Sequence, residues 1–112
     1  MRSLNLLVLR CRDVEASRAF YETFGLHFTR HAHGSGPEHF AYEDERGVIE
    51  LYPATSQTPG DMTGLGFRVE NLEESRRTLA AYAPGAIREN SWGRSFVARD
   101  PDGRRVEVTQ AR

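Results

Sequence analysis

The segment RCRDVEASR at residues 10–18 recurs as RVENLEESR at residues 68–76, an offset of 58 residues. A second segment, DERGVIEL at residues 44–51, is echoed at residues 100–108, where DPDG is followed closely by RVEV. Between the glutamates of these two segments, Glu50 and Glu107, the offset is 57 residues. A repeat of this length predicts that the chain is built from two copies of one supersecondary unit.

Hydrophobic periodicity predicts the same order of elements in each copy, a strand, a helix and three further strands. Asp13 and Asn71 are predicted helix N-caps, because their side chains can accept a free backbone N–H. We therefore expect an α+β fold of two tandem βαβββ units within a single domain, residues 1–112. The first unit spans about residues 3–53, the linker about 54–62 and the second unit about 63–110. The units are expected to form one curved mixed sheet around a cup, with the helices on its convex side.

The composition disfavours several classes of partner. A net charge of −1 gives no electrostatic reason to expect nucleic acid or an anionic membrane. The apolar run at residues 4–9 is too short to span a membrane and lacks a signal-peptide cleavage site. The single cysteine, Cys11, indicates no disulfide framework, so we expect a cytoplasmic protein.

Strand alternation points to a polar site on the concave face. Ile49, Leu51, Val106 and Val108 are expected to face the helices, which leaves Glu50 and Glu107 on the opposite face. The two carboxylates occupy equivalent positions of the repeat and are candidate site residues.

The chain resembles the vicinal oxygen chelate superfamily, which includes glyoxalase I, extradiol dioxygenases and bleomycin-binding resistance proteins. The resemblance covers nearly the whole chain. It rests on DVEASRAFY with FGL at residues 13–26, on VIELYP at residues 48–53, and on WGRSF leading into DPDG at residues 92–103. It implies a small-molecule site inside the cup, and it implies a homodimer.

Enzymes of this superfamily usually hold a divalent metal with one residue from the first strand and one glutamate from the last strand of each unit. Glu50 and Glu107 match the glutamate positions, but the first-strand positions carry Leu6 and Gly64, which cannot bind a metal. We therefore expect no metal and no cofactor. His31, His33 and His39 could be drawn as a metal cluster. However, they match no ligand position of the family, so a solvated hairpin tip is favoured for the cluster.

Aromatic residues complete the expected ligand site. A four-residue turn at residues 44–47 places Ala41 opposite Glu50 and His39 opposite Tyr52 on the concave face. The same reasoning pairs Phe96 with Glu107 and Ala98 with Arg105. Trp92 and Phe96 are interpreted either as pocket or as core residues. The predicted ligand-binding residues are Glu50, Glu107, Trp92, Phe96, Tyr52, His39 and Arg68.

Three functions are consistent with these residues. The favoured one is a metal-independent binder of a small organic molecule, of the antibiotic-resistance type closest to the bleomycin-binding members, with no catalytic residue assigned. The alternative is an enzyme of the same superfamily, either a metal-dependent lyase, isomerase or dioxygenase, or a metal-free enzyme that uses a glutamate as general base. The third is an interaction or regulatory module.

Overall fold

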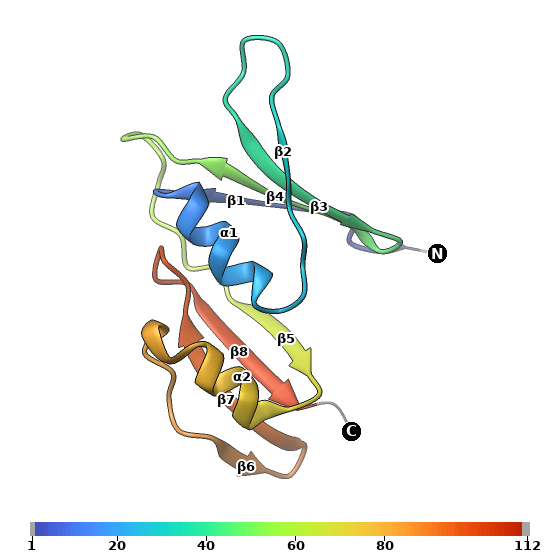
Figure 1. The fold of residues 1–112 in the computed structure, drawn as a ribbon, viewed down its shortest axis with the longest axis vertical. Coiled ribbons are helices and arrows are strands. Elements are labelled where there is room, and N and C mark those ends of the chain that lie inside the picture. Colours follow the sequence, from blue (N-terminus) through green and yellow to red (C-terminus); the bar gives the residue numbers. More distant parts are fainter. Residues whose placement is uncertain (1, 111–112) are drawn as a thin grey trace. The chain divides into compact units, whose positions relative to one another are not determined.

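A computed structural model describes residues 2–110 and confirms two tandem βαβββ units (Figure 1). The first unit contains β1 (Leu6–Cys11), α1 (Val14–Glu22), β2 (Thr29–His31), β3 (His39–Asp44) and β4 (Gly47–Pro53). The second contains β5 (Leu65–Val69), α2 (Leu72–Thr78), a short 3-10 helix (Ala80–Tyr82), β6 (Arg88–Asn90), β7 (Gly93–Arg99) and β8 (Arg105–Gln110). The boundary between the compact units, after Pro59, falls within the predicted linker.

The backbone hydrogen bonds join the strands into two four-stranded mixed sheets of the same topology. The strand order is β1-β4-β3-β2 in the first unit and β5-β8-β7-β6 in the second. In both, the first strand pairs in parallel with the last, and the remaining pairs are antiparallel. Each unit thus has its own sheet, where one mixed sheet had been expected. The cup around which the units are expected to curl remains a prediction.

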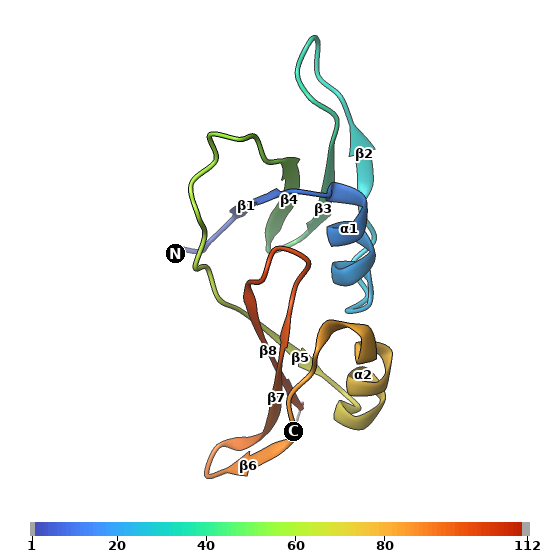
Figure 2. The same cartoon turned by 90° about the vertical axis from the view of Figure 1, so that its left-hand side faces the viewer.

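Each helix lies across one face of its own sheet, as Figures 1 and 2 show. The apolar residues between helix and sheet are fully or almost fully buried in both units. In the first unit they are Leu9, Cys11, Phe20, Tyr21, Phe40 and Leu51. In the second unit they are Leu72, Leu79, Phe96, Ala98, Val106 and Val108. The predicted apolar alternation of β4 and β8 is thus confirmed at Leu51, Val106 and Val108. The other face of each sheet is left for polar side chains.

The predicted helix caps are present. Asp13 accepts a hydrogen bond from the backbone N–H of Ala16 at 3.1 Å, and Asn71 accepts one from Glu74 at 3.0 Å. Gly25, with φ of 86°, follows the C-terminal turn of α1 in the left-handed conformation that favours glycine. The second helix, α2, ends at Thr78, and the chain continues as the 3-10 helix.

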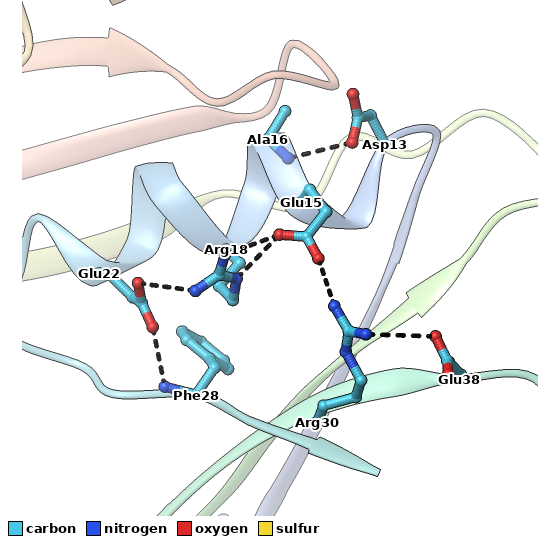
Figure 3. A network of polar contacts seen from close by, with 8 residues as sticks. All are labelled: Asp13, Glu15, Ala16, Arg18, Glu22, Phe28, Arg30 and Glu38. Carbon is cyan, nitrogen blue, oxygen red and sulfur yellow. Dashed lines mark hydrogen bonds and ion pairs between the residues drawn. The ribbon is translucent and has the colours of Figure 1, made fainter. Parts of the chain in front are cut away.

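Ion pairs attach β2 to α1 (Figure 3). Arg30 of β2 lies 3.0 Å from Glu15 of α1, and Glu15 also binds Arg18 at 2.7 Å. Glu22, near the end of the helix, accepts the backbone N–H of Phe28 at 3.1 Å. The side chain of Arg30 therefore lies on the helix side of β2, and its neighbours in the strand, Thr29 and His31, point to the opposite face.

Candidate functional site

The helix-free face of the first sheet holds a column of flat side chains, one from each strand. Arg10 of β1 pairs in register with Tyr52 of β4, and its guanidinium lies 4.8 Å from the centre of the Tyr52 ring. Tyr52 stacks on His39 of β3 with ring centres 4.2 Å apart and an angle of 9° between the planes. His39 pairs in register with His31 of β2, at a ring distance of 5.8 Å.

His39 is held firmly in this column. Its side chain is buried, with 2 % exposed. Its Nδ1 lies 3.3 Å from the carbonyl oxygen of Pro37, and its Nε2 lies 3.3 Å from the hydroxyl of Tyr52 and 3.6 Å from Oε2 of Glu50. The predicted neighbourhood of His39, Tyr52 and Glu50 is therefore confirmed, as is the pairing of Ala41 with Glu50.

A cavity of about 470 Å³ opens on the same face. All four histidines of the chain line it, together with Glu43, Glu50 and small or apolar residues of β2, β3 and β4. The complete lining is His27, Thr29, His31, His33, His39, Ala41, Glu43, Val48 and Glu50. These residues belong to the first unit alone.

His33 is exposed in the loop after β2, as the interpretation as a solvated hairpin tip expects, whereas His39 is buried. The rings of His31, His33 and His39 lie between 5.2 and 5.8 Å from one another along one wall of the cavity. His27 was missed as a candidate, although residues 27, 29, 31 and 33 alternate along one extended segment and should share a face. Among residues 2–110, no three His, Cys, Asp or Glu side chains are grouped to hold a metal ion.

The second unit carries a different set of side chains on its helix-free face. Glu107 pairs in register with Val97 and Gly66, and its carboxylate lies 3.5 Å from Arg105. Arg68 is exposed on the same face of β5, beside Thr109. The carboxylate of Glu107 therefore has Arg105 as an ion-pair partner.

The predicted pairing of Phe96 with Glu107 is wrong. Phe96 pairs with Val108 and is 2 % exposed, so it belongs to the core under α2. The turn before β8 is Asp100–Gly103, but Asp100 also donates its backbone N–H to the carbonyl oxygen of Arg104 at 3.0 Å, and the strands resume pairing one residue later than assumed, with Arg99 opposite Arg105. Trp92, by contrast, is 53 % exposed and lies in the turn between β6 and β7.

A tight buried ion-pair cluster fixes the turn before β8. The side chain of Arg104 is 1 % exposed, and it lies 2.6 Å from Asp61, 3.0 Å from Asp100 and 3.5 Å from Asp102. Asp61, Asp100 and Asp102 all belong to the second unit. We interpret this cluster as structural.

Residues 3–108 match the family model described as Glyoxalase/Bleomycin resistance protein/Dioxygenase superfamily. Comparison with curated proteins gives no significant match. No helix among residues 2–110 is long and apolar enough to cross a membrane.

Solved structures share the fold over nearly the whole chain. TnmS3, an antibiotic-binding protein from Streptomyces sp. CB03234, has a TM-score of 0.77 at 21% identity, covering 100% of this chain and 98% of that one. A bleomycin-binding protein in complex with bleomycin has a TM-score of 0.65 at 19% identity, covering 100% of both chains. Lactoylglutathione lyase from Agrobacterium tumefaciens has a TM-score of 0.68 at 20% identity, covering 97% and 93%. At these identities the similarity shows the fold.

Proposed function

Because the chain belongs to the glyoxalase/bleomycin resistance protein/dioxygenase superfamily, we propose that it binds a small organic molecule without a metal and sequesters it unchanged. The observation that carries this proposal is the cavity of the first unit, whose lining includes Glu50 and His39, with Tyr52 stacked on His39. Its volume of about 470 Å³ lies in the range of small-molecule sites, which combine flat side chains with a few fixed polar groups.

The first strand supports a site without metal. Glu50 pairs in register with Val8 of β1, and Leu6 lies two residues away, on the same face of the strand. Neither side chain has an atom that can coordinate a metal. In the second unit, Gly64 and Gly66 offer no ligand atom from their side chains either. A catalytic divalent ion usually has three or more protein ligands, more than the family's two glutamates supply.

Three further properties belong to this proposal. The protein acts in the cytoplasm, since its single cysteine is a small buried residue with no disulfide partner in the chain. It forms a homodimer, because a chain of this size gains much buried surface by pairing. Its role is of the antibiotic-resistance type, which the antibiotic-binding neighbours TnmS3 and the bleomycin-binding protein support.

A thermal-shift screen tests the proposal. The protein, treated with chelator, is heated with metal-free bleomycin and with a panel of flat aromatic antibiotics. A ligand of the native state raises the melting temperature by mass action. We expect at least one compound to raise it in chelator, and we expect Tyr52→Leu to weaken that binding, because the ring of Tyr52 stacks on His39 in the cavity lining. No shift from any compound, or shifts only after metal is added, would contradict the proposal.

The second candidate is a metal-dependent lyase, isomerase or dioxygenase of the same superfamily. It is favoured by the presence of Glu50 and Glu107 at the family's glutamate positions and by the fold of lactoylglutathione lyase. The metal content of protein purified without chelator discriminates between the two, because this candidate requires about one tightly held divalent ion per site.

A further inference from the structure

The helix-free face of the first sheet is organised in three rows that run across the strands. The first row is the column of flat side chains, Arg10, Tyr52, His39 and His31. The second row contains Val8, Glu50, Ala41 and Thr29, which are paired in register. The third row contains Val48 and Glu43, which pair with each other, and His27 lines the same cavity. Because Ala41 and Thr29 are small, the middle row forms the floor of a trough between two higher walls.

Glu50 is the charged group in the floor of this trough. Its side chain is 23% exposed, and among residues 2–110 its one ionisable partner is His39 at 3.6 Å. A carboxylate has about four acceptor positions. A distance of 3.6 Å is too long for a good hydrogen bond. Glu50 therefore retains acceptor capacity at the cavity, and because its side chain is only 23% exposed, a charged partner there contributes more than it does in water.

The remaining charges around the trough also favour a positive ligand. Glu43 adds a second carboxylate to the lining, which contains no arginine or lysine. Arg10 of β1 also lies on this face, with its guanidinium over the ring of Tyr52. It is not part of the cavity lining. The ionisable groups on this face are Arg10 from β1, His27, His31 and His33 from β2 and its flanks, His39 and Glu43 from β3, and Glu50 and Tyr52 from β4.

The second unit lacks this arrangement. By register, Val97 of β7 corresponds to Ala41 and Glu107 to Glu50. Arg99 then takes the place of Glu43, and Arg105 takes the place of Val48. In the same way, Ser95 corresponds to His39 and Thr109 corresponds to Tyr52. Glu107 has an arginine, Arg105, at 3.5 Å, whereas the described residues place no arginine or lysine in an ion pair with Glu50.

We propose that the trough of the first unit recognises a flat aromatic compound with a cationic nitrogen, which donates hydrogen bonds to Glu50 while its ring packs against the imidazoles of His31, His33 and His39. The proposal rests on the proposed function and adds to it the ligand class, the recognising carboxylate and a stoichiometry of one ligand per chain.

Two probes of nearly equal shape test the role of charge. The cation 2-naphthamidine and the neutral 2-naphthamide differ in the group that would meet Glu50. Binding is followed by the imidazole Cε1–H signals in NMR spectra, because all four histidines line the trough and report on it directly. We expect 2-naphthamidine to move these signals and to bind about tenfold or more tightly than 2-naphthamide, as a charge-assisted hydrogen bond implies.

Glu50→Gln keeps the shape of the side chain and removes its charge. We expect this variant to bind the two probes within about twofold of each other, whereas Glu70→Gln, at an exposed position of the second unit, keeps the full preference. Both variants are first checked for folding by their far-ultraviolet circular dichroism. If Glu50→Gln does not fold, the preference of the wild-type protein and the imidazole shifts still decide the question.

The outcomes separate this inference from the proposed function. Equal affinity for the two probes, an unchanged preference in Glu50→Gln, or no binding of 2-naphthamidine at about 1 mM would overturn the cation site. The antibiotic panel in chelator decides the proposed function independently, since a neutral compound that raises the melting temperature satisfies it without Glu50.

Discussion

Replacing Arg104 by Met removes the charge at the centre of the buried cluster and keeps a side chain of similar length. In the wild-type protein the guanidinium lies 3.0 Å from the Asp100 carboxylate, and the side chains of both residues are at most 1% exposed. Without Arg104 the Asp100 carboxylate loses this guanidinium and retains the backbone N–H groups of residues 102 and 104, each at 2.9 Å.

The magnitude follows from the burial of the partners. Removing one member of a buried ion pair typically costs about 3–5 kcal/mol, because the other charge stays desolvated. The pair with Asp61 adds less, at most about 1 kcal/mol, because the Asp61 side chain is 33% exposed. We therefore expect Arg104→Met to lower the free energy of unfolding by about 3–5 kcal/mol, measured by urea denaturation and circular dichroism. A loss below about 1 kcal/mol would refute the interpretation of this cluster as a buried structural pair.

The acid limb of the stability curve gives an independent check. Hydrogen bonds from Thr63, and then the guanidinium of Arg104, lower the pKa of Asp61 from 3.8 to about 2. A lowered carboxyl pKa stabilises the folded state fully above about pH 4, and this contribution is lost as the pH falls towards 2. After allowance for solvent screening it amounts to about 1 kcal/mol. In Arg104→Met the loss between these two pH values should be smaller, because only the hydrogen bonds from Thr63 remain.

The remaining predictions concern the two aromatic candidates and the assembly. Phe96→Ala should destabilise the protein by about 3–5 kcal/mol, since it opens a cavity in the core, whereas Trp92→Ala should change stability by less than about 0.5 kcal/mol. Thermal and urea unfolding of both variants measure this difference, and equal effects would contradict the assigned burial. Sedimentation at micromolar concentration should give a homodimer, and a monomer there would exclude the predicted assembly.

The sequence predicted the two βαβββ units because the local signals and the repeat agree. Asp13 and Asn71 begin the helices as expected, and Gly25 follows the end of α1. The pairing of Ala41 with Glu50 was also predictable, since Glu45 and Arg46 form a tight turn in which the Asp44 carboxylate accepts the backbone N–H of Arg46 at 2.8 Å. A side chain at Gly47 would collide with the backbone of Asn5, which explains the glycine after this turn.

The equivalent turn of the second unit shows why register is harder to predict. Asp100 and Arg104 form a longer turn stabilised by the buried guanidinium, and the distant partner Asp61 is invisible in the local sequence. A shift of one residue transfers every side chain of a strand to the other face. Phe96 thereby lies in the core instead of the predicted ligand face.

The common face of the histidines follows from the same alternation of side chains along an extended segment. The structure of this segment was instead predicted from its composition. Glycine and proline at residues 34–37 suggested a solvated tip for the whole hairpin. Arg30 forms an ion pair with Glu15 of α1 on the helix side of β2, and His31 therefore points to the opposite face, beside His39. Such a long-range constraint cannot be read from the hairpin sequence alone.

Native mass spectrometry of protein purified without chelator tests metal-free binding of a small molecule most directly. The spectrum is recorded before and after addition of the compound that gives the largest thermal shift. We predict that the chain carries no stoichiometric metal before addition and gains the mass of one ligand per chain afterwards. A chain that already carries about one tightly bound divalent ion, or that takes up the compound only together with a metal, would contradict this account and favour the metal-dependent enzyme.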